Sequence, residues 1–154
     1  MYYSKKELPI ETAAENLWQL CEKSYQHKSP WTKEQFDIDL TQALTDYCIW
    51  IEADQWKGFI SYQKILDEIE ISHVVIHQKF QGQGLGSQLL DHAILLFKEQ
   101  GISRVFLEVR ESNEGARRLY ERKGFELLNR RKNYYTRPKE DGLVMCLTIK
   151  EVKQ

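Results

Sequence analysis

The order of apolar and polar positions along the chain predicts a mixed α/β protein. Apolar residues at helical spacing and capping signals predict helices over residues 11–26, from the capping box Thr32–Gln35, over 86–99 and over 113–123. β-Rich runs predict strands at residues 47–52, 58–62, 68–76, 103–110, 125–136 and 143–150. The first three strands are separated by turn-like breaks, which predicts an antiparallel meander, and residues 138–142 are expected to form a loop of the last hairpin.

A glycine-rich turn joins a predicted strand to a predicted helix. It reads Gln81-Gly82-Gln83-Gly84-Leu85-Gly86 and follows the apolar run Val74-Val75-Ile76. Glycines let backbone N–H groups approach an anion closely, and a helix N-terminus adds roughly half a positive charge. The pattern therefore predicts a phosphate site, and a pyrophosphate is the favoured ligand.

Two nucleotide-binding patterns are tested against this turn by spacing. A Walker loop needs Gly-Lys-Ser/Thr at its end, whereas Gly86 is followed by Ser87-Gln88. A dinucleotide-binding loop needs G-x-G-x-x-G after the first strand, but the glycines here are one residue too close and lie in the middle of the chain. A P-loop is excluded and NAD is not expected.

The turn matches the Q/R-x-x-G-x-G/A loop of the GNAT family of N-acetyltransferases, which binds the pyrophosphate of acetyl-CoA. Further matches are Pro30-Trp31-Thr32, the Leu-Glu-Val-Arg-x-Ser-Asn run from Leu107, the Leu-Tyr-x-x-x-Gly-Phe run from Leu119, and the segments 130–135 and 141–145. Together they resemble the bacterial ribosomal-protein-alanine N-acetyltransferases over essentially the whole chain. The resemblance implies one N-acetyltransferase domain over residues 1–154. It also implies a mixed, mostly antiparallel central sheet, flanked by helices and splayed between strands four and five.

The resemblance also implies residue roles. Glu108 matches the glutamate that accepts the proton of the amine, and Tyr120 matches the tyrosine that protonates the departing CoA sulfur. Asn113 matches an asparagine that contacts CoA. Structural alternatives stay open: Glu108 as a surface residue paired with Arg110, Tyr120 as a packing residue, and Asn113 as a helix N-cap.

Acetyl-CoA is the implied co-substrate, with no metal. The implied donor-binding residues are Val74, Val75, Ile76, Gln81, Gly82, Gln83, Gly84, Leu85, Gly86, Ser87 and Asn113. Tyr134 and Tyr135 match paired tyrosines near the peptide cleft. Gly82 stands where the family often has a basic residue, and Gly115 replaces a common alanine in a helix, at a cost of up to ~1 kcal/mol.

Composition supports a folded, single-domain protein. The chain has 154 residues, of which 42% are hydrophobic and 12% aromatic. No apolar run approaches the roughly 18 residues that span a bilayer, and the first residues lack the apolar segment of a signal peptide. We therefore expect a cytoplasmic protein without a membrane partner.

Cysteine, histidine and charge patterns exclude several other functions. Three widely spaced cysteines, Cys21, Cys48 and Cys146, indicate buried thiols, and His73 and His77 are not expected to converge on a metal. Residues 1–80 carry 8 lysines against 13 acids, and residues 81–154 carry 14 cations against 10 acids. The cations of the second half alternate with glutamates, which disfavours nucleic-acid binding. The acidic first half would attract a cationic amine or a basic peptide.

The function predicted from these features is transfer of acetyl from acetyl-CoA to the N-terminal α-amine of a protein. The resemblance points to a small-subunit ribosomal protein as acceptor and to direct attack in a ternary complex. Two alternatives remain: the acceptor is a small amine such as a polyamine, an antibiotic or an amino acid, or the chain is a CoA-binding module without catalysis. The sequence determines neither the acceptor nor the oligomeric state.

Overall fold

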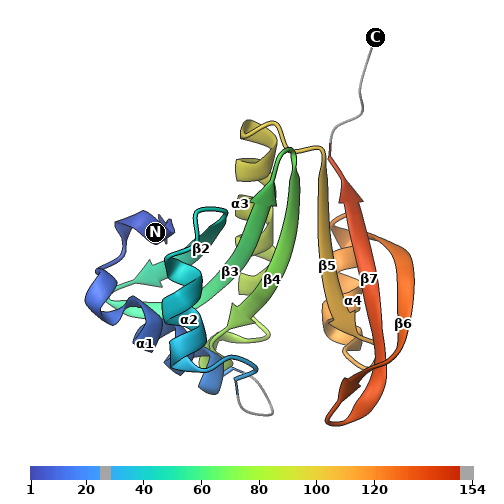
Figure 1. Ribbon diagram of the computed structural model, residues 1–154, viewed down its shortest axis with the longest axis horizontal. Coiled ribbons are helices and arrows are strands. Elements are labelled where there is room, and N and C mark those ends of the chain that lie inside the picture. The colour runs from blue at the N-terminus through green and yellow to red at the C-terminus, as the bar shows by residue number, and fades with distance from the viewer. Residues whose placement is uncertain (25–28, 150–154) are drawn as a thin grey trace. The chain divides into compact units, whose positions relative to one another are not determined.

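The structure is a computed structural model that describes residues 1–24 and 29–149 (Figure 1). The strands are β1 (Tyr2–Tyr3), β2 (Thr45–Glu52), β3 (Gln55–Ile65), β4 (Glu68–Ile76), β5 (Arg104–Arg110), β6 (Glu126–Thr136) and β7 (Lys139–Thr148). The α-helices are α1 (Ile10–Glu22), α2 (Lys33–Leu40), α3 (Leu85–Glu99) and α4 (Glu114–Arg122), and short 3₁₀ turns occupy η1 (Lys5–Glu7) and η2 (Gln78–Phe80).

These elements confirm the predicted fold class. The strand order is β1-β2-β3-β4-β5-β7-β6, in which β4 and β5 form a parallel pair. β1–β2, β2–β3, β5–β7 and β6–β7 are antiparallel. The registered pairing of β4 with β5 comprises Glu68–Glu70 and Arg104–Phe106, at the beginning of each strand.

Local sequence signals explain most element boundaries. The Thr32–Gln35 capping box opens α2: the backbone N–H of Gln35 donates to Thr32 Oγ1 (3.2 Å) and that of Thr32 to Gln35 Oε1 (2.8 Å). α4 ends before Gly124, whose φ of 100° suits a residue without a side chain. The end of the first predicted helix, at residues 25–26, and the last residue of the final predicted strand lie outside the described residues.

Several boundaries differ from the prediction. α1 ends at Glu22, before the predicted end at residue 26, and β3 extends over Gln55–Ile65 beyond the predicted 58–62. β1 was not predicted, because a two-residue strand carries no periodicity; it forms by pairing with Ile49 and Trp50 of β2. The expected loop at 138–142 is wrong, since β7 already begins at Lys139. Tertiary pairing with β5 and β6 overrides the turn-forming tendency of this polar, glycine-containing segment.

The chain divides into two compact units, each with its own buried residues. The first comprises residues 1–63 and 73–93, and its core packs α1 and α2 on β2 and β3 through side chains that include Leu17, Phe36, Tyr47 and Phe59. Tyr47 donates a hydrogen bond to Asp39 Oδ2 of α2 (2.6 Å), which fastens that helix to β2.

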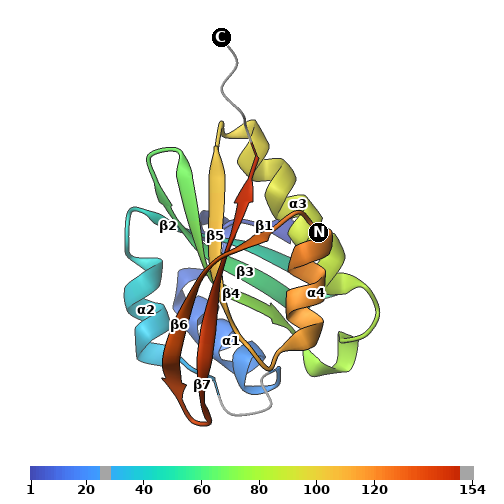
Figure 2. The same ribbon diagram turned by 90° about the vertical axis from the view of Figure 1, so that its right-hand side faces the viewer.

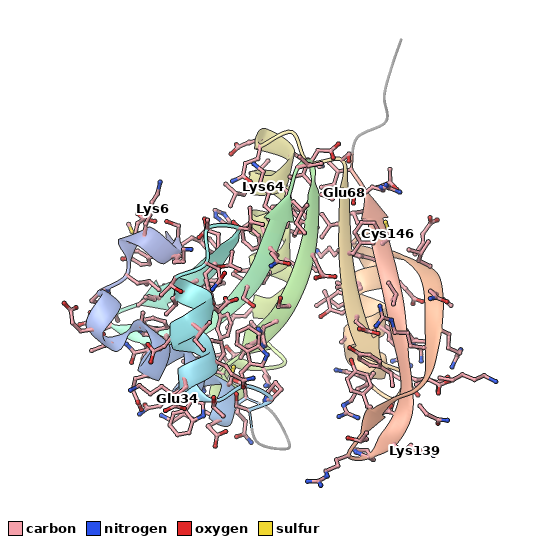
Figure 3. All side chains as sticks on the ribbon, viewed as in Figure 1. Lys6, Glu34, Lys64, Glu68, Lys139 and Cys146 are labelled. Carbon is pink, nitrogen blue, oxygen red and sulfur yellow. The ribbon has the colours of Figure 1, made fainter. Side chains whose placement is uncertain are left out.

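The second unit comprises residues 64–72 and those from 94 onward. Its buried side chains alternate along β5 and β7 and include Val105, Leu107, Val109, Leu143 and Met145. Figure 2 shows the β6–β7 hairpin and α4, and Figure 3 labels Glu68, which pairs with Arg104, and Cys146 on β7. β6 is the edge strand and is exposed along almost its whole length. In the described part of the chain, no helix is long and apolar enough to cross a membrane.

Candidate active site

The glycine-rich turn lies in the first unit and has the backbone that an anion site requires. Gly82 and Gly84 adopt φ values of 79° and 81°, and α3 begins directly afterwards at Leu85. A Cβ at either glycine would meet nothing within 4 Å, so the turn needs glycine for its backbone conformation rather than for space. Because the first N–H groups of a helix have no acceptor within it, the start of α3 presents donors.

The side chain of Gln81 is engaged within the protein. Its Nε2 donates to the carbonyl of Ile76 at the end of β4 (2.8 Å) and to that of Ser24 after α1 (3.1 Å). The neighbouring Gln78 N–H donates to the Lys23 carbonyl (3.3 Å). Gln81 therefore fastens the turn to the rest of the first unit, and phosphate contacts would come from backbone N–H groups.

The strand before the turn is anchored by its buried face. Val75 is buried in the first core, while Val74 and Ile76 are half-buried. His73 is buried on the same face as Val75; its Nδ1 lies 2.7 Å from Ser61 Oγ, and its ring packs edge-on against Trp31, 4.6 Å between ring centres. Burial lowers the pKa of His73 to about 4, so the imidazole is neutral at pH 7.

No metal cluster forms around His73. Throughout residues 1–24 and 29–149, no group of three or more His, Cys, Asp or Glu side chains could hold a metal ion. His77 lies at the strand exit, where its Nδ1 accepts the N–H of Lys79 (3.0 Å). The histidines of this strand thus have structural partners.

Glu108 lies in the second unit, on β5 opposite Val144 of β7. Its Oε2 is enclosed by protein and has no hydrogen-bond donor among the described residues. The guanidinium Nε of Arg131 lies 3.4 Å away, close enough for an ion pair but without the geometry of a hydrogen bond. The alternative pairing with Arg110 does not occur, because Arg110 pairs with Glu140 at 3.0 Å. A buried acceptor without a donor is rare in proteins and marks a candidate reactive group.

Two tyrosine rings lie over the same glycine as this carboxylate. A Cβ added at Gly142 would lie 3.0 Å from Glu108 Oε2, 3.2 Å from the Tyr134 ring and 3.3 Å from the Tyr135 ring, so all three groups meet over this glycine. Burial, and next the charge of Glu108, raises the pKa of Tyr135 to about 12. Arg110 stacks on the Tyr135 ring at 4.1 Å, which holds the ring in place.

Tyr120 is buried on α4, 7% exposed, with its ring 5.7 Å from that of Phe125. Burial raises the pKa of its phenol far above the ordinary value, and the nearby Tyr135 adds to the effect. Tyr120 is therefore protonated throughout the physiological range, the state required of a proton donor. Tyr135 interacts electrostatically with both Glu108 and Tyr120, so these candidates share one neighbourhood.

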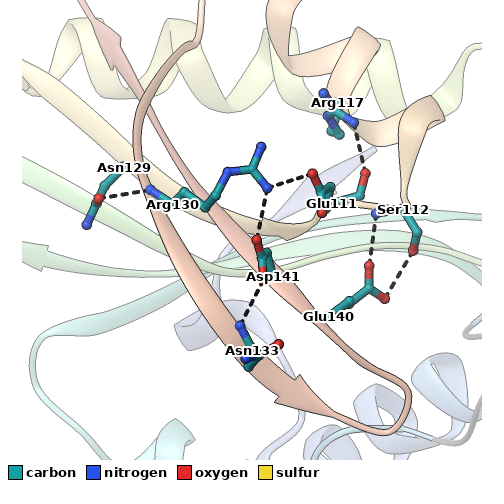
Figure 4. Close-up of polar contacts among 8 residues, drawn as sticks. All are labelled: Glu111, Ser112, Arg117, Asn129, Arg130, Asn133, Glu140 and Asp141. Carbon is teal, nitrogen blue, oxygen red and sulfur yellow. Dashed lines mark hydrogen bonds and ion pairs between the residues drawn. The ribbon is translucent and has the colours of Figure 1, made fainter.

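Asn113 performs the structural role that the sequence left open. Its side-chain oxygen accepts the N–H of Ala116 (3.2 Å) and caps α4. The preceding Ser112 donates its N–H and its hydroxyl to Glu140, at 2.9 and 3.1 Å (Figure 4). The start of α4 is thus tied to the β6–β7 hairpin.

Arg131 and Gly142 are two neighbours of Glu108 that sequence reasoning missed. Strand pairing brings them together, since Gly142 is opposite Arg131 on one side and Arg110 on the other. A glycine within a strand often marks a close approach, and this signal at Gly142 was instead assigned to a loop. Arg131 is the arginine of the matching Arg-x-x-Tyr-Tyr segment, but that resemblance predicts no contact between it and Glu108.

Comparison with known proteins shows the family of the chain. The chain matches the Acetyltransferase (GNAT) family over residues 10–125. It belongs to the GNAT family. A [ribosomal protein bS18]-alanine N-acetyltransferase from Escherichia coli (strain K12) is 33% identical over 125 residues, covering 80% of this chain and 84% of the relative.

Two solved structures extend the comparison. The ribosomal-protein-S18-alanine N-acetyltransferase from Escherichia coli superposes with a TM-score of 0.89 at 28% identity, over 100% of this chain and 96% of that one. A GNAT acetyltransferase from Elizabethkingia anophelis, solved with acetyl-CoA bound, shares the fold with a TM-score of 0.75 at 20% identity, over 96% of this chain and 97% of that one. The chain is therefore a GNAT N-acetyltransferase that is similar to ribosomal-protein-alanine N-acetyltransferases, and its family uses acetyl-CoA.

Proposed function

We propose that this GNAT enzyme transfers acetyl from acetyl-CoA to the N-terminal α-amine of a protein, with ribosomal protein bS18 as the favoured acceptor. The Glu108 carboxylate beside Tyr134 and Tyr135 carries the proposal. No described donor bonds its Oε2, and its side chain as a whole is 24% exposed, so the carboxylate can serve as an acceptor for an incoming amine. The similarity to the Escherichia coli ribosomal-protein-alanine N-acetyltransferases supports the choice of acceptor.

The reaction needs a neutral amine and a protonated leaving group. A peptide α-amine has a pKa of about 8, so at neutral pH a nearby carboxylate has only one weakly held proton to remove. Glu108 takes this proton, and the neutral amine nitrogen then attacks the thioester carbonyl in a ternary complex. The C–N bond forms, the C–S bond breaks, and Tyr120 gives its phenolic proton to the sulfur of CoA. The second proton of the nitrogen passes to solvent as the amide forms, and the proton held by Glu108 restores the phenol of Tyr120 after the transfer.

The donor is assigned to backbone groups of the first unit. The N–H groups around Gly82, Gly84 and the start of α3 would bind the pyrophosphate, and the backbone of Val74–Ile76 would pair with the pantetheine arm. The positive φ values of both glycines support this assignment, because they turn successive N–H groups outward from a tight bend. Because position 82 has no cationic side chain, these backbone N–H groups would supply most of the binding energy for the pyrophosphate.

Peptide acetylation tests the proposed acceptor. The enzyme is incubated with acetyl-CoA and an Ala-led peptide of the bS18 N-terminus, with the same peptide carrying a blocked N-terminus as control. We expect CoA release and a mass increase at the α-amine only with the free peptide. Turnover of polyamines, aminoglycosides or free amino acids without peptide turnover would overturn the acceptor assignment, and acetyl-CoA binding without turnover of any amine would overturn catalysis.

Tyr120→Phe tests the proton donor. The ring and its contact with Phe125 remain, so we expect the fold and acetyl-CoA affinity to persist while turnover falls by about tenfold or more. Phe125→Leu is the packing control, since it alters the same contact without removing a hydroxyl. Unchanged turnover in Tyr120→Phe would remove this residue from its role.

A further inference from the structure

The two tyrosines beside Glu108 are consecutive in sequence. A regular strand would not bring both of their rings to the same side of the sheet. Successive side chains of a strand point to opposite faces of the sheet. Yet the rings of Tyr134 and Tyr135 both lie over Gly142, 3.2 and 3.3 Å from where its Cβ would be, and their centres are 5.1 Å apart. Something in β6 must redirect one of them.

A bulge in β6 provides the redirection. Arg131 pairs with Gly142 and Tyr135 with Glu140, so four residue steps on β6 face two steps on β7. Asn133 lies within the bulge at φ 51°, a left-handed conformation that asparagine tolerates far better than β-branched residues. The extra residues interrupt the alternation of side chains along β6. Both tyrosine rings therefore lie on the face of the sheet that carries Glu108.

One carboxylate closes the bulge. Asp141 Oδ1 accepts the backbone N–H of Asn133 at 2.8 Å, and its Oδ2 pairs with Arg130 at 3.0 Å (Figure 4). Arg130 also pairs with Glu111 at 2.6 Å. The Asn133 N–H bond is the largest contribution to the lowered pKa of Asp141, which marks it as the principal contact of that carboxylate.

We propose that Asn133 and Asp141 are positioning residues for the acceptor: they hold the β6 bulge that turns Tyr134 and Tyr135 together toward the Glu108 carboxylate. This inference rests on the proposed function, because the tyrosines would line the place where the amine is bound. The role requires the left-handed backbone at Asn133 and an acceptor at Asp141 Oδ1. Neither side chain needs to touch the substrate.

Substitutions at Asn133 separate backbone conformation from side-chain chemistry. Asn133→Val disfavours positive φ, and we expect the KM for the Ala-led peptide to rise by roughly tenfold or more, with the KM for acetyl-CoA unchanged. Asn133→Gly keeps the conformation and should stay within about twofold of the wild type. Asn129→Val is the matched control, because it makes the same change on the same strand at a residue without positive φ.

Substitutions at Asp141 separate the hydrogen bond from the ion pair. Asp141→Ala removes the acceptor and should reproduce the KM increase of Asn133→Val. Asp141→Asn keeps an oxygen for the Asn133 N–H, and Arg130→Gln removes only the ion pairs, so both should stay within about threefold. A purely structural role would instead lower the active fraction, and so kcat, at constant peptide KM. That result in Asn133→Val, or its peptide KM matching that of Asn133→Gly, would overturn the proposal.

Fluorine NMR provides a readout without an acceptor. In protein labelled with 3-fluorotyrosine, the Tyr134 and Tyr135 resonances are assigned by Tyr134→Phe and Tyr135→Phe. We expect both resonances to shift in Asn133→Val and to keep their positions in Asn133→Gly and Asn129→Val. Unshifted resonances in Asn133→Val would show that the bulge does not set the direction of the two rings. If the wild type acetylates no peptide, the proposed function fails separately. The KM comparison is then made with the amine that it does acetylate.

Discussion

The glycine-rich turn at 81–86 and the carboxylate cluster around Glu108 are built in different ways. The turn is a continuous piece of chain whose donors are backbone N–H groups, directed by two glycines at positive φ. The cluster combines side chains from β5 and β6, brought together over Gly142 of β7 by strand pairing and a bulge. The proposed donor site should therefore tolerate side-chain changes that keep the backbone, whereas the proposed acceptor site should depend on its particular neighbours.

The strongest test of the comparison is Glu108→Gln. The amide is nearly isosteric but cannot accept the proton of the amine, so we expect kcat to fall by about a hundredfold or more, with acetyl-CoA affinity near the wild-type value. Stopped-flow or steady-state CoA release measures kcat, and calorimetry measures donor binding. Glu126→Gln, an exposed position on β6, is the control. If the acetyl-CoA affinity of Glu108→Gln fell together with its kcat, the glycine-rich turn and the Glu108 cluster would not act separately.

Acid stability distinguishes the two units. The pKa of His73 is about 4 in the folded protein against an ordinary 6.5, so below about pH 6.5 the unfolded chain binds the extra proton first. Folding stability should therefore fall as the pH decreases from about 6.5 to 4, by up to about 3 kcal/mol, and be unaffected above that window.

Urea unfolding across that window measures the effect. His73→Gln should flatten the pH dependence of stability, although this variant is less stable at neutral pH. His77 is less buried, so His77→Gln should retain the pH dependence. An unchanged slope in His73→Gln would contradict this assignment.

In the second unit, hydrogen bonds lower the pKa values of Glu140 and Asp141. The stabilisation from these carboxylates is therefore present above the ordinary carboxylate range and lost only at more acidic pH.

Paired glycine substitutions test the donor turn. Gly84→Ala and Gly101→Ala introduce a Cβ into open space at φ 81° and 77°, so each should destabilise the fold by about 1 kcal/mol through backbone strain alone. Only Gly84→Ala should also weaken acetyl-CoA binding, by about tenfold, because it reshapes the proposed pyrophosphate contacts. Calorimetric titration of both variants measures this, and equal affinities would exclude the turn as the donor site.

The smallest effect is expected at Gly115. This residue lies in the first turn of α4 without positive φ, and an added Cβ would meet nothing within 4 Å. Gly115→Ala should stabilise the protein by about 0.5 kcal/mol, mainly by restricting the unfolded chain. Thermal unfolding measures the gain. Turnover should not change, and a lower stability would contradict the open surroundings of Gly115.

The sequence by itself determined the features that depend on local conformation. The capping box at Thr32–Gln35 and the stop at Gly124 follow from preferences of a few neighbouring residues and appear in the structure. The helix predicted from residue 86 begins one residue earlier, at Leu85. Motif resemblance placed the chain in its family for the same reason, because its glycine turn and the Leu107–Phe125 stretch are continuous.

Tertiary structure alone decided which distant side chains meet. Strand register placed Arg131 beside Glu108, gave Arg110 to Glu140 instead, and converted the expected loop at 138–142 into the start of β7. The β6 bulge set the direction of Tyr135 relative to Tyr134, which strict alternation would have separated. Register and bulges arise from pairing between segments far apart in sequence, so no local pattern encodes them.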